Sequence, residues 1–426
     1  MFASLRIRNY RLFASGSLVS NTGTWMQRVA QDWLVLELSG GSGVALGIVT
    51  ALQFGPILLF GMYGGMLADR YDKRRVLLAT QTSLGLLALT LGLLDVAGVV
   101  ALWHVYLLAA GLGIATSLDT PVRQAFVSEL VGPDRLPNAV GLNSATFNAA
   151  RLIGPGVAGL LIAAFSTGPV FLINAASFGF TIVALMAMRP AELFRSARVA
   201  RGKGQLREAL RYVRARPDLL LPMVLVFIVG TFGLNFQLTT ALMAREVFGL
   251  GASAFGLLGS CVAVGALSGA LLSTRRTTRP RLRLLIGAAV AFGVAEIVVG
   301  LMPTFVAFAI FLVPAGATAL IFIIAANSSV QLGVDATMRG RVMALYLLFF
   351  MGGTPVGAPI VGWLAEHFGP RSGIVVGGIC SLLAAVVIGL YLAARSGLRV
   401  EAHVHSRPHL QLSVPVTERE PVRQAG

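Results

Sequence analysis

The sequence predicts an all-α membrane protein with twelve transmembrane helices in two pseudo-symmetric six-helix bundles and both termini cytoplasmic. Three observations predict this fold. Hydrophobic residues make up 56% of the 426 residues and charged residues only 12%, with a mean hydropathy of +0.80, whereas a soluble domain carries about 25% charged residues. The apolar residues form runs long enough to cross a hydrocarbon core of about 30 Å as helices. One long polar interruption, at 189–218, divides these runs into two sets of six.

Apolar runs bounded by Gly, Pro or Arg give the position of each span. The first set lies near 12–38, 43–68, 76–95, 101–125, 138–165 and 169–188. The second set lies near 219–247, 253–274, 283–302, 305–330, 340–366 and 372–395. The chain therefore divides into an N-terminal bundle (1–188), a linker (189–218), a C-terminal bundle (219–395) and a disordered cytoplasmic tail (396–426).

The distribution of Lys and Arg predicts the orientation. Alternate loops are rich in these residues, whereas the turns at 39–42, 96–100, 166–168 and 303–304 contain none. Basic loops stay on the cytoplasmic side of a bacterial membrane. The linker itself contains a basic amphipathic helix, Leu206 to Arg216, which we expect to lie on anionic lipid.

Weak internal repetition supports two related halves. Gly23 and Gln27 match Gly233 and Gln237 at an offset of 210, and Pro155 matches Pro355 at 200. A parallel repeat of two such halves places a substrate site at their interface, near the middle of the membrane.

Composition also excludes several classes of function. The net charge of +16 is spread over short loops, so it predicts orientation and no nucleic-acid partner. Cys261 and Cys380 lie inside apolar runs, and His403, His405 and His409 lie in the tail, so we expect no metal and no cofactor. No phosphate loop of an ATP-driven pump and no midplane cluster of an enzyme is present in the sequence. We therefore expect no enzymatic activity.

The first span carries a polar stripe at helical spacing. Polar side chains facing lipid are costly, so the stripe lines protein or a water-filled cavity. We predict that Asn21, Thr24, Gln27 and Gln31 line a substrate cavity, with Asn235 and Thr239 as their counterparts in the seventh span. Arg28 and Asp32 are one turn apart and can pair. Asp32 is a candidate proton carrier, with a structural ion pair as the alternative.

The fifth span contains a second group of polar and small residues. Asn148, Arg151 and Pro155 share a face, and Gly154 and Gly159 permit close helix packing. Asn148 is a further candidate cavity residue. Arg151 has either Asp32 or a substrate anion as its natural partner, and a permanent Asp32–Arg151 pair is an equal alternative. Glu296, alone in the ninth span, is expected to reach the interface or to be paired.

The charged turn at 64–76, between the second and third spans, closely resembles the signature loop of the major facilitator superfamily of secondary transporters. Asn148, Arg151, Gly154 and Pro155, together with 339–342, sharpen the resemblance toward the drug-exporter branch, which includes enterobactin-exporter-like proteins and transmembrane secretion effectors. The second-half copy of the loop has Ser273 where the first half has Asp69. Gly111 stands where many proton-coupled relatives carry Arg.

The resemblance implies a monomeric secondary transporter of the bacterial cytoplasmic membrane that works by alternating access. Its cavity would be lined by spans one, four, seven and ten. Asp32, Arg28 and Arg151 would couple a proton to transport. The cytoplasmic gate would consist of Gly65, Asp69, Arg70, Arg74, Asp119 and Arg123.

We expect an antiporter that exports a small amphipathic molecule, of the drug or siderophore type, in exchange for protons. An importer or a lysolipid flippase of the same fold is an alternative. A membrane subunit that needs a separate energising partner is an alternative from another class.

Overall fold

The structure is a computed structural model that describes residues 3–194, 205–273, 282–335, 337–395, 399–403 and 409–413. The first half begins with a short turn of 3-10 helix, η1 (Ala3–Arg6), tied to the sixth helix because Ser4 donates a hydrogen bond to Asn138. Its helices are α1 (Arg8–Leu38), α2 (Gly43–Phe54), α3 (Pro56–Arg70), α4 (Lys73–Val96), α5 (Leu102–Val131), α6 (Leu136–Phe165) and α7 (Thr167–Met186), followed by η2 (Pro190–Glu192).

The second half follows the linker helix α8 (Gln205–Arg214). Its helices are α9 (Pro217–Phe232), α10 (Phe236–Leu242), η3 (Met243–Val247), α11 (Ala252–Ser273), α12 (Leu282–Leu301), α13 (Phe305–Gly333), α14 (Arg339–Phe368) and α15 (Pro370–Arg395). The sequence predicted a single run at 219–247. In the structure, three residues without helical structure, Gly233–Asn235, separate α9 from α10.

Local chemistry explains where several helices begin. Ser42 accepts a hydrogen bond from the Ala45 amide at the start of α2, and Asp72 accepts one from the Arg75 amide at the start of α4. Both are N-cap residues that satisfy an amide with no partner inside its own helix. Pro56 opens α3, so the second span bends between α2 and α3.

Eleven helical segments of the described residues are long and apolar enough to cross a membrane. α1, with 31 residues, is not among them, because its polar side chains lower its hydropathy. It nevertheless packs along α6 and α7 as part of the first bundle.

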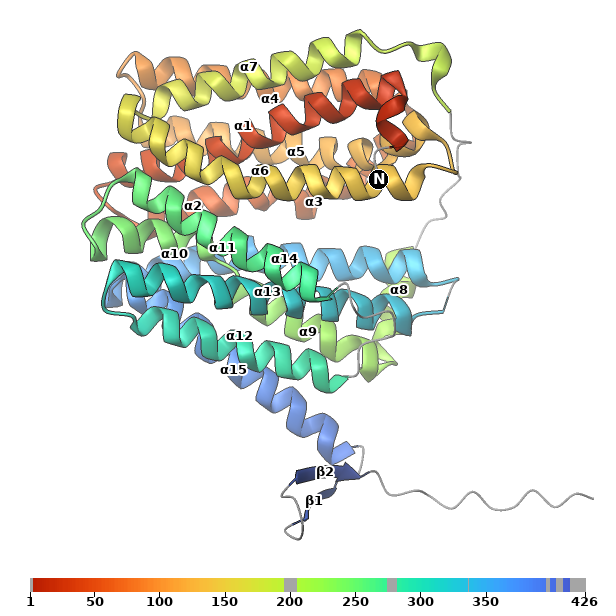
Figure 1. Cartoon of the computed structure of the whole chain (residues 1–426), viewed down its shortest axis with the longest axis vertical. Coiled ribbons are helices and arrows are strands. Elements are labelled where there is room, and N and C mark those ends of the chain that lie inside the picture. The colour runs from red at the N-terminus through yellow and green to blue at the C-terminus, as the bar shows by residue number, and fades with distance from the viewer. Residues whose placement is uncertain are drawn as a thin grey trace, which may run out of the picture.

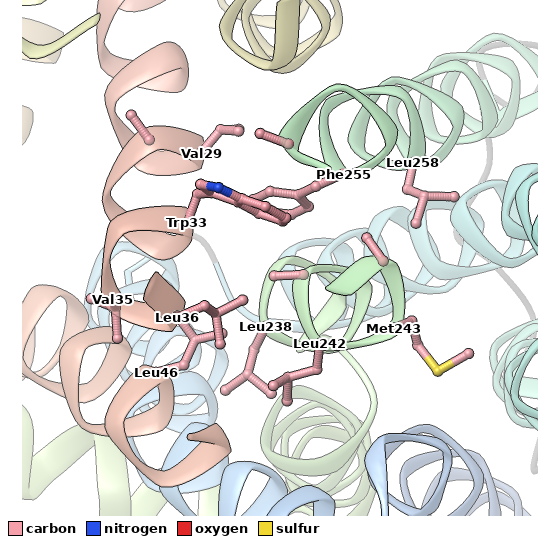
Figure 2. Packing of buried hydrophobic residues seen from close by; sticks show 14 of the residues in the cluster. Val29, Trp33, Val35, Leu36, Leu46, Leu238, Leu242, Met243, Phe255 and Leu258 are labelled. Atoms are coloured by element: carbon pink, nitrogen blue, oxygen red, sulfur yellow. The ribbon is translucent and has the colours of Figure 1, made fainter. Parts of the chain in front are cut away.

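The two halves stack with their helices roughly parallel (Figure 1). We call the end of the bundle that holds the N-terminus and α8 the linker end, and the other the far end. Near the far end, one buried apolar cluster draws on both halves, and it includes Val29 and Leu46 of the first half and Leu238 and Leu258 of the second (Figure 2). Trp33 of α1 stacks on Phe255 of α11 with ring centroids 6.3 Å apart.

Toward the linker end the apolar core is divided. One cluster, around Phe13 and Phe126, belongs to the first half, and another, around Phe292 and Phe322, belongs to the second. The buried apolar contacts that join the halves are therefore concentrated away from the linker end.

Very close backbone contacts also join the halves. A Cβ on Gly43 of α2 would lie 2.5 Å from the Gly362 carbonyl oxygen of α14. A Cβ on Gly159 of α6 would lie 2.7 Å from the Ala252 carbonyl oxygen of α11. Only glycine permits such approaches. Gly154, another predicted packing residue, lies against α1, where an added Cβ would meet the Trp25 Cβ at 2.6 Å.

The linker helix α8 docks on the second half, which differs from the expected position on lipid. Ala209 and Val213 are buried in the core of the second half. Arg341 of α14 donates a hydrogen bond to Glu208 at 2.7 Å, and the Tyr212 hydroxyl donates one to Asp335 at 2.6 Å. Its apolar face is therefore covered by protein.

The predicted disordered tail contains two short strands, β1 (Arg399–His403) and β2 (His409–Ser413), which pair antiparallel. The sequence missed this pair because neither run is long or strongly apolar. The rest of that prediction, at 396–398, 404–408 and 414–426, lies outside the described residues. The basic loop at 274–281 also lies outside them.

Candidate functional site

A cavity of about 310 Å³ lies between the two halves. The first half lines it with residues of α1, α2 and α6, and the second half with the break before α10 and with α10, α11, α13 and α14. The expected contribution of the fourth span differs from the structure, since α5 supplies none of the described lining residues. Most of the lining is apolar or aromatic. The charged lining residues are Arg28, Asp32 and Arg151.

Asp32 links the two halves at this cavity. It is only 4% exposed, and its Oδ2 accepts a hydrogen bond from Gln237 Nε2 of α10 at 2.5 Å. Because Asp32 belongs to the first half and Gln237 to the second, this bond changes whenever the halves move apart. A buried carboxylate in a membrane segment marks a functional site by default.

Arg28 and Arg151 share one aromatic ring. The Arg28 guanidinium carbon lies 4.6 Å from the centre of the Trp25 ring and 5.2 Å from that of Phe54, and the Arg151 guanidinium carbon lies 5.7 Å from the Trp25 ring. Arg28 Nε is buried without a hydrogen-bond partner. Among the described residues, neither arginine forms an ion pair with Asp32.

The predicted one-turn pairing of Arg28 with Asp32 is therefore absent from this conformation, and so is the Asp32–Arg151 pair. Two cations and one carboxylate line a mostly apolar cavity. Such a site can bind a ligand that carries negative charge and aromatic surface.

Of the seven predicted cavity residues, Asn235 lines the cavity. The others lie elsewhere in this conformation. Gln27 accepts a hydrogen bond from Asn174 of α7, inside the first half. Thr24 and Asn148 donate hydrogen bonds to carbonyl oxygens of their own helices, at Ser20 and Ser144 respectively. Thr239 donates one to the carbonyl oxygen of Asn235, the residue before α10.

Two further residues of the predicted set also lie outside the lining. Gln31 is 1% exposed with its Nε2 unpartnered, and Asn21 is half-buried on α1. α1 is packed on most sides by its own bundle, so much of its polar stripe serves contacts within that bundle.

The sequence interpretation missed several lining residues. They are Trp25, Thr50, Gln53, Phe54 and Gln237. One signal was available for Gln237, because it is the repeat counterpart of Gln27. The aromatic residues gave no signal, since Trp and Phe in an apolar run look the same whether they face lipid or a cavity.

The predicted gate residues lie at the linker end of the first half. Asp119 accepts hydrogen bonds from Thr80 at 2.6 Å, from Gln81 at 2.8 Å and from Arg123 at 2.9 Å. Arg74 donates to the carbonyl oxygens of Leu185 and Met186 at the end of α7. These bonds all stay within the first half.

The charged turn itself connects α3 to α4. Gly65, Asp69 and Arg70 lie in the last turns of α3. Gly64, the residue before Gly65, lies close to α5, since a Cβ there would lie 2.6 Å from the Ser117 carbonyl oxygen. The turn is therefore packed on α5 through glycine.

Comparisons with known proteins show the family to which the chain belongs. The family model described as "Transmembrane secretion effector" matches residues 1–422. The chain is 25% identical to the staphyloferrin A transporter of Staphylococcus aureus (strain NCTC 8325 / PS 47) over 62% of this chain and 66% of that protein. It is 27% identical to the uncharacterized MFS-type transporter YfiS of Bacillus subtilis (strain 168) over 62% of each. The chain thus spans less than two thirds of the length of these two relatives.

The match to a third relative is longer. The chain is 26% identical to the enterobactin exporter EntS of Escherichia coli O1:K1 / APEC, over 82% of this chain and 83% of that one.

Solved structures show the same fold. A bacterial homologue of the human lysosomal transporter Spinster superposes with a TM-score of 0.70 at 16% identity, over 91% of this chain and 97% of that one. A POT family transporter in complex with 5-aminolevulinic acid gives 0.71 at 12% identity, over 90% and 96%.

Proposed function

Because the chain belongs to the transmembrane secretion effectors of the major facilitator fold, a family of secondary transporters, we propose that it exports an anionic amphipathic small molecule of the siderophore class in exchange for protons. It is a multi-pass protein of the bacterial inner membrane. The proposed substrate class is supported by the names of two relatives, the staphyloferrin A transporter and the enterobactin exporter.

The observation that carries the proposal is the pair of arginines in the cavity. Arg28 and Arg151 hold two positive charges over the Trp25 ring, and Asp32 supplies one negative charge. Carboxylate or catecholate oxygens can accept hydrogen bonds from the guanidinium groups, and an aromatic substrate can pack on the apolar walls. A cationic drug would be disfavoured by these two arginines.

The proposed topology has twelve spans, with α1 as the first. α1 is long enough to cross the membrane, and the proposed cavity shelters its polar side chains from lipid. The linker end is proposed as cytoplasmic, because the basic turn at 70–75 and the basic linker helix lie there. Both termini are then on the cytoplasmic side.

Transport is proposed to proceed by alternating access of a monomer. The halves share a buried core near the far end and have separate cores toward the linker end. That arrangement supports rocking of one half on the other around the cavity. In the opposite state, Asp69, Arg70 and Arg74, positioned by Gly65 and by the Asp119–Arg123 pair, would hold the linker end closed.

Asp32 is proposed to carry the proton. Its hydrogen bond with Gln237 crosses between the halves, so its surroundings depend on the conformation. When the proton leaves, the carboxylate can pair with Arg28 or Arg151. Charge state and conformation would form one coupled equilibrium.

Proton flux in liposomes tests this function. Purified protein is reconstituted, a pH gradient is imposed, and catecholate siderophores, carboxylate siderophores and hydrophobic cations are added in turn. We expect proton movement with an anionic siderophore and a loss of at least about tenfold in Asp32→Asn, with substrate binding retained. Asp95→Asn is the matched control, because Asp95 accepts a hydrogen bond from Thr167 inside the first half, away from the cavity.

Wild-type flux in Asp32→Asn would exclude the proton role of Asp32. Flux with hydrophobic cations alone would contradict the anion proposal. Movement of lysolipid, or transport only after addition of a membrane extract, would instead favour a flippase or a subunit that needs an energising partner.

A further inference from the structure

Glu296 of α12 is a buried acid that the proposed transport cycle does not use. Its side chain is 3% exposed, and its Oε2 has no hydrogen-bond partner. Among the described residues, no Lys, Arg or His forms an ion pair with it. The expectation that it would reach the interface or be paired therefore differs from the structure.

The Glu296 carboxyl group is wedged against the break between α9 and α10. A Cβ on Gly233 would lie 2.9 Å from Glu296 Oε2 and 2.8 Å from Ser381 Oγ of α15. A Cβ on Gly377 of α15 would lie 3.2 Å from Glu296 Oε1 and 2.5 Å from the Phe232 carbonyl oxygen. Gly233 and Gly377 thus let the end of α9 and α15 close around the carboxyl group.

A second polar group in this cluster also lacks a partner. Ser381 is fully buried, and its Oγ has no hydrogen-bond partner. The Phe292 ring fills the adjacent space, because its Cε1 would lie 2.6 Å from a Cβ on Gly233. The cluster therefore offers oxygen atoms but little room for a cation with its water shell.

An isolated carboxylate in this setting would be very costly, because the side chain is buried and no described residue forms an ion pair with it. A neutral carboxylic acid avoids that cost. A proton is the ligand that this packing can accept without rearrangement.

We propose that Glu296 binds a proton and that loss of this proton moves the non-helical segment Gly233–Asn235 away from the carboxyl group. The other side of the break faces the cavity, where Leu234 and Asn235 line it and Gln237 donates to Asp32. A charged Glu296 needs hydration, and hydration requires the glycine-lined wall to move. Movement of that wall changes the part of the cavity that the second half lines. The protonation of Glu296 therefore affects the substrate site from the opposite side of the break.

Other titratable groups near Glu296 are few. On α15, Cys380 adjoins Ser381, and α13, which also packs along α12, carries no acidic, basic, Cys or Tyr residue. From α9 and the break, the contacting groups are the Phe232 carbonyl and Gly233, neither of which titrates. Glu296 and Cys380 are therefore the groups whose titration must be separated, and a Cys380→Ala background does this.

Infrared difference spectroscopy of the protein in lipid nanodiscs tests the proposal. Carbon-13 labelling of glutamate shifts the C=O band of a protonated Glu but not that of Asp, which separates Glu296 from Asp32 without mutation. The other buried glutamate of the described residues, Glu129, is ion-paired with Lys73 at 2.6 Å, and the Glu296→Gln variant separates its signal from that of Glu296. We expect a glutamic acid band at neutral pH that disappears in Glu296→Gln and persists in Asp32→Asn.

Amide hydrogen exchange measures the linked movement. Raising the pH should remove the acid band and, over the same range, increase exchange at 232–236 in the wild type relative to Glu296→Gln, whose side chain stays neutral. A neutral-pH spectrum with no labelled acid band that Glu296→Gln removes would overturn the proton site. Equal exchange in both proteins would overturn the link to the break. Neither readout uses transport, so both stand apart from the test of Asp32.

Discussion

Trp25 lies beside both arginines of the cavity, with guanidinium carbons at 4.6 Å and 5.7 Å from its ring centre. A cation over an indole ring is stabilised by about 0.5–2 kcal/mol. Because Trp25 fixes two like charges near each other, it keeps the site ready for an anion.

Replacing Trp25 should therefore weaken anion binding. We expect Trp25→Leu to raise the Kd of a transported anionic siderophore about tenfold, equivalent to about 1.4 kcal/mol. Trp25→Phe should lose less, because a phenyl ring retains part of the interaction. Isothermal titration calorimetry measures both. Trp103→Leu serves as control, since Trp103 is 60% exposed at the start of α5; an unchanged Kd in Trp25→Leu would remove Trp25 from the site.

Sequence periodicity predicted which face of α1 is polar, but not which neighbour each side chain meets. Asp32 and Gln27 belong to the same stripe, yet Asp32 bonds to Gln237 of the second half and Gln27 to Asn174 of the first. A helix in a bundle is surrounded by protein on several sides, so a polar face can be satisfied within its own half. The choice depends on packing between distant segments, which a single sequence does not display.

Among the elements, α2 and α14 make the closest link between the halves near the far end. Glu366 of α14 accepts hydrogen bonds from the Ser42 hydroxyl at 2.6 Å and from the Val44 amide at 2.9 Å. A carboxylate of the second half therefore caps the N-terminus of a helix of the first. Such an exposed charge at a helix N-terminus contributes about 0.3–1 kcal/mol.

Removing this charge should favour opening of the far end. We expect Glu366→Gln to raise the ratio of open to closed molecules about three- to fivefold, which corresponds to somewhat less than 1 kcal/mol. Spin labels at Val99 and Phe368, both exposed and on opposite halves, would report the distance distribution by electron paramagnetic resonance. Glu37→Gln is the matched control, because Glu37 bonds to Trp33 within α1. An equal shift in both variants would refute a specific cap.

The sequence predicted most helices close to where they lie, because long apolar runs and charged loops dominate the pattern. The breaks inside spans were harder to predict. Pro56 gives a chemical reason for the bend between α2 and α3, whereas Gly233–Asn235 carries no proline. That break packs on Glu296 and Ser381, and these contacts between distant segments became visible only in the structure.

For the whole molecule, the division into two halves could be predicted from the polar interruption at 189–218 and the weak repeat. The arrangement of the two halves relative to each other could not be predicted from the sequence. An alternating-access protein must encode at least two arrangements of its halves with similar free energy, so its sequence favours neither strongly. If the proposed alternating access holds, the divided cores toward the linker end and the shared core near the far end describe one of these arrangements.

A cross-link between α6 of the first half and α11 of the second would test whether these two helices must separate during transport. A Cβ on Gly156 of α6 would lie 3.1 Å from Ser260 Oγ of α11, so cysteines at both positions are within disulfide reach. In a background with Cys261 and Cys380 replaced by alanine, we expect oxidation of the Gly156→Cys/Ser260→Cys protein to reduce proton flux at least about tenfold, with recovery after reduction.

A cross-link within one half separates this effect from general damage. Asp95 and Thr167 both belong to the first half and their side chains are hydrogen-bonded at 2.5 Å. The oxidised Asp95→Cys/Thr167→Cys protein should retain its flux, because rigid-body rocking leaves contacts inside a half unchanged. Full flux in a completely cross-linked 156–260 protein would mean that α6 and α11 stay together throughout the cycle. The substrate would then have to leave by movement of α2 against α14 alone.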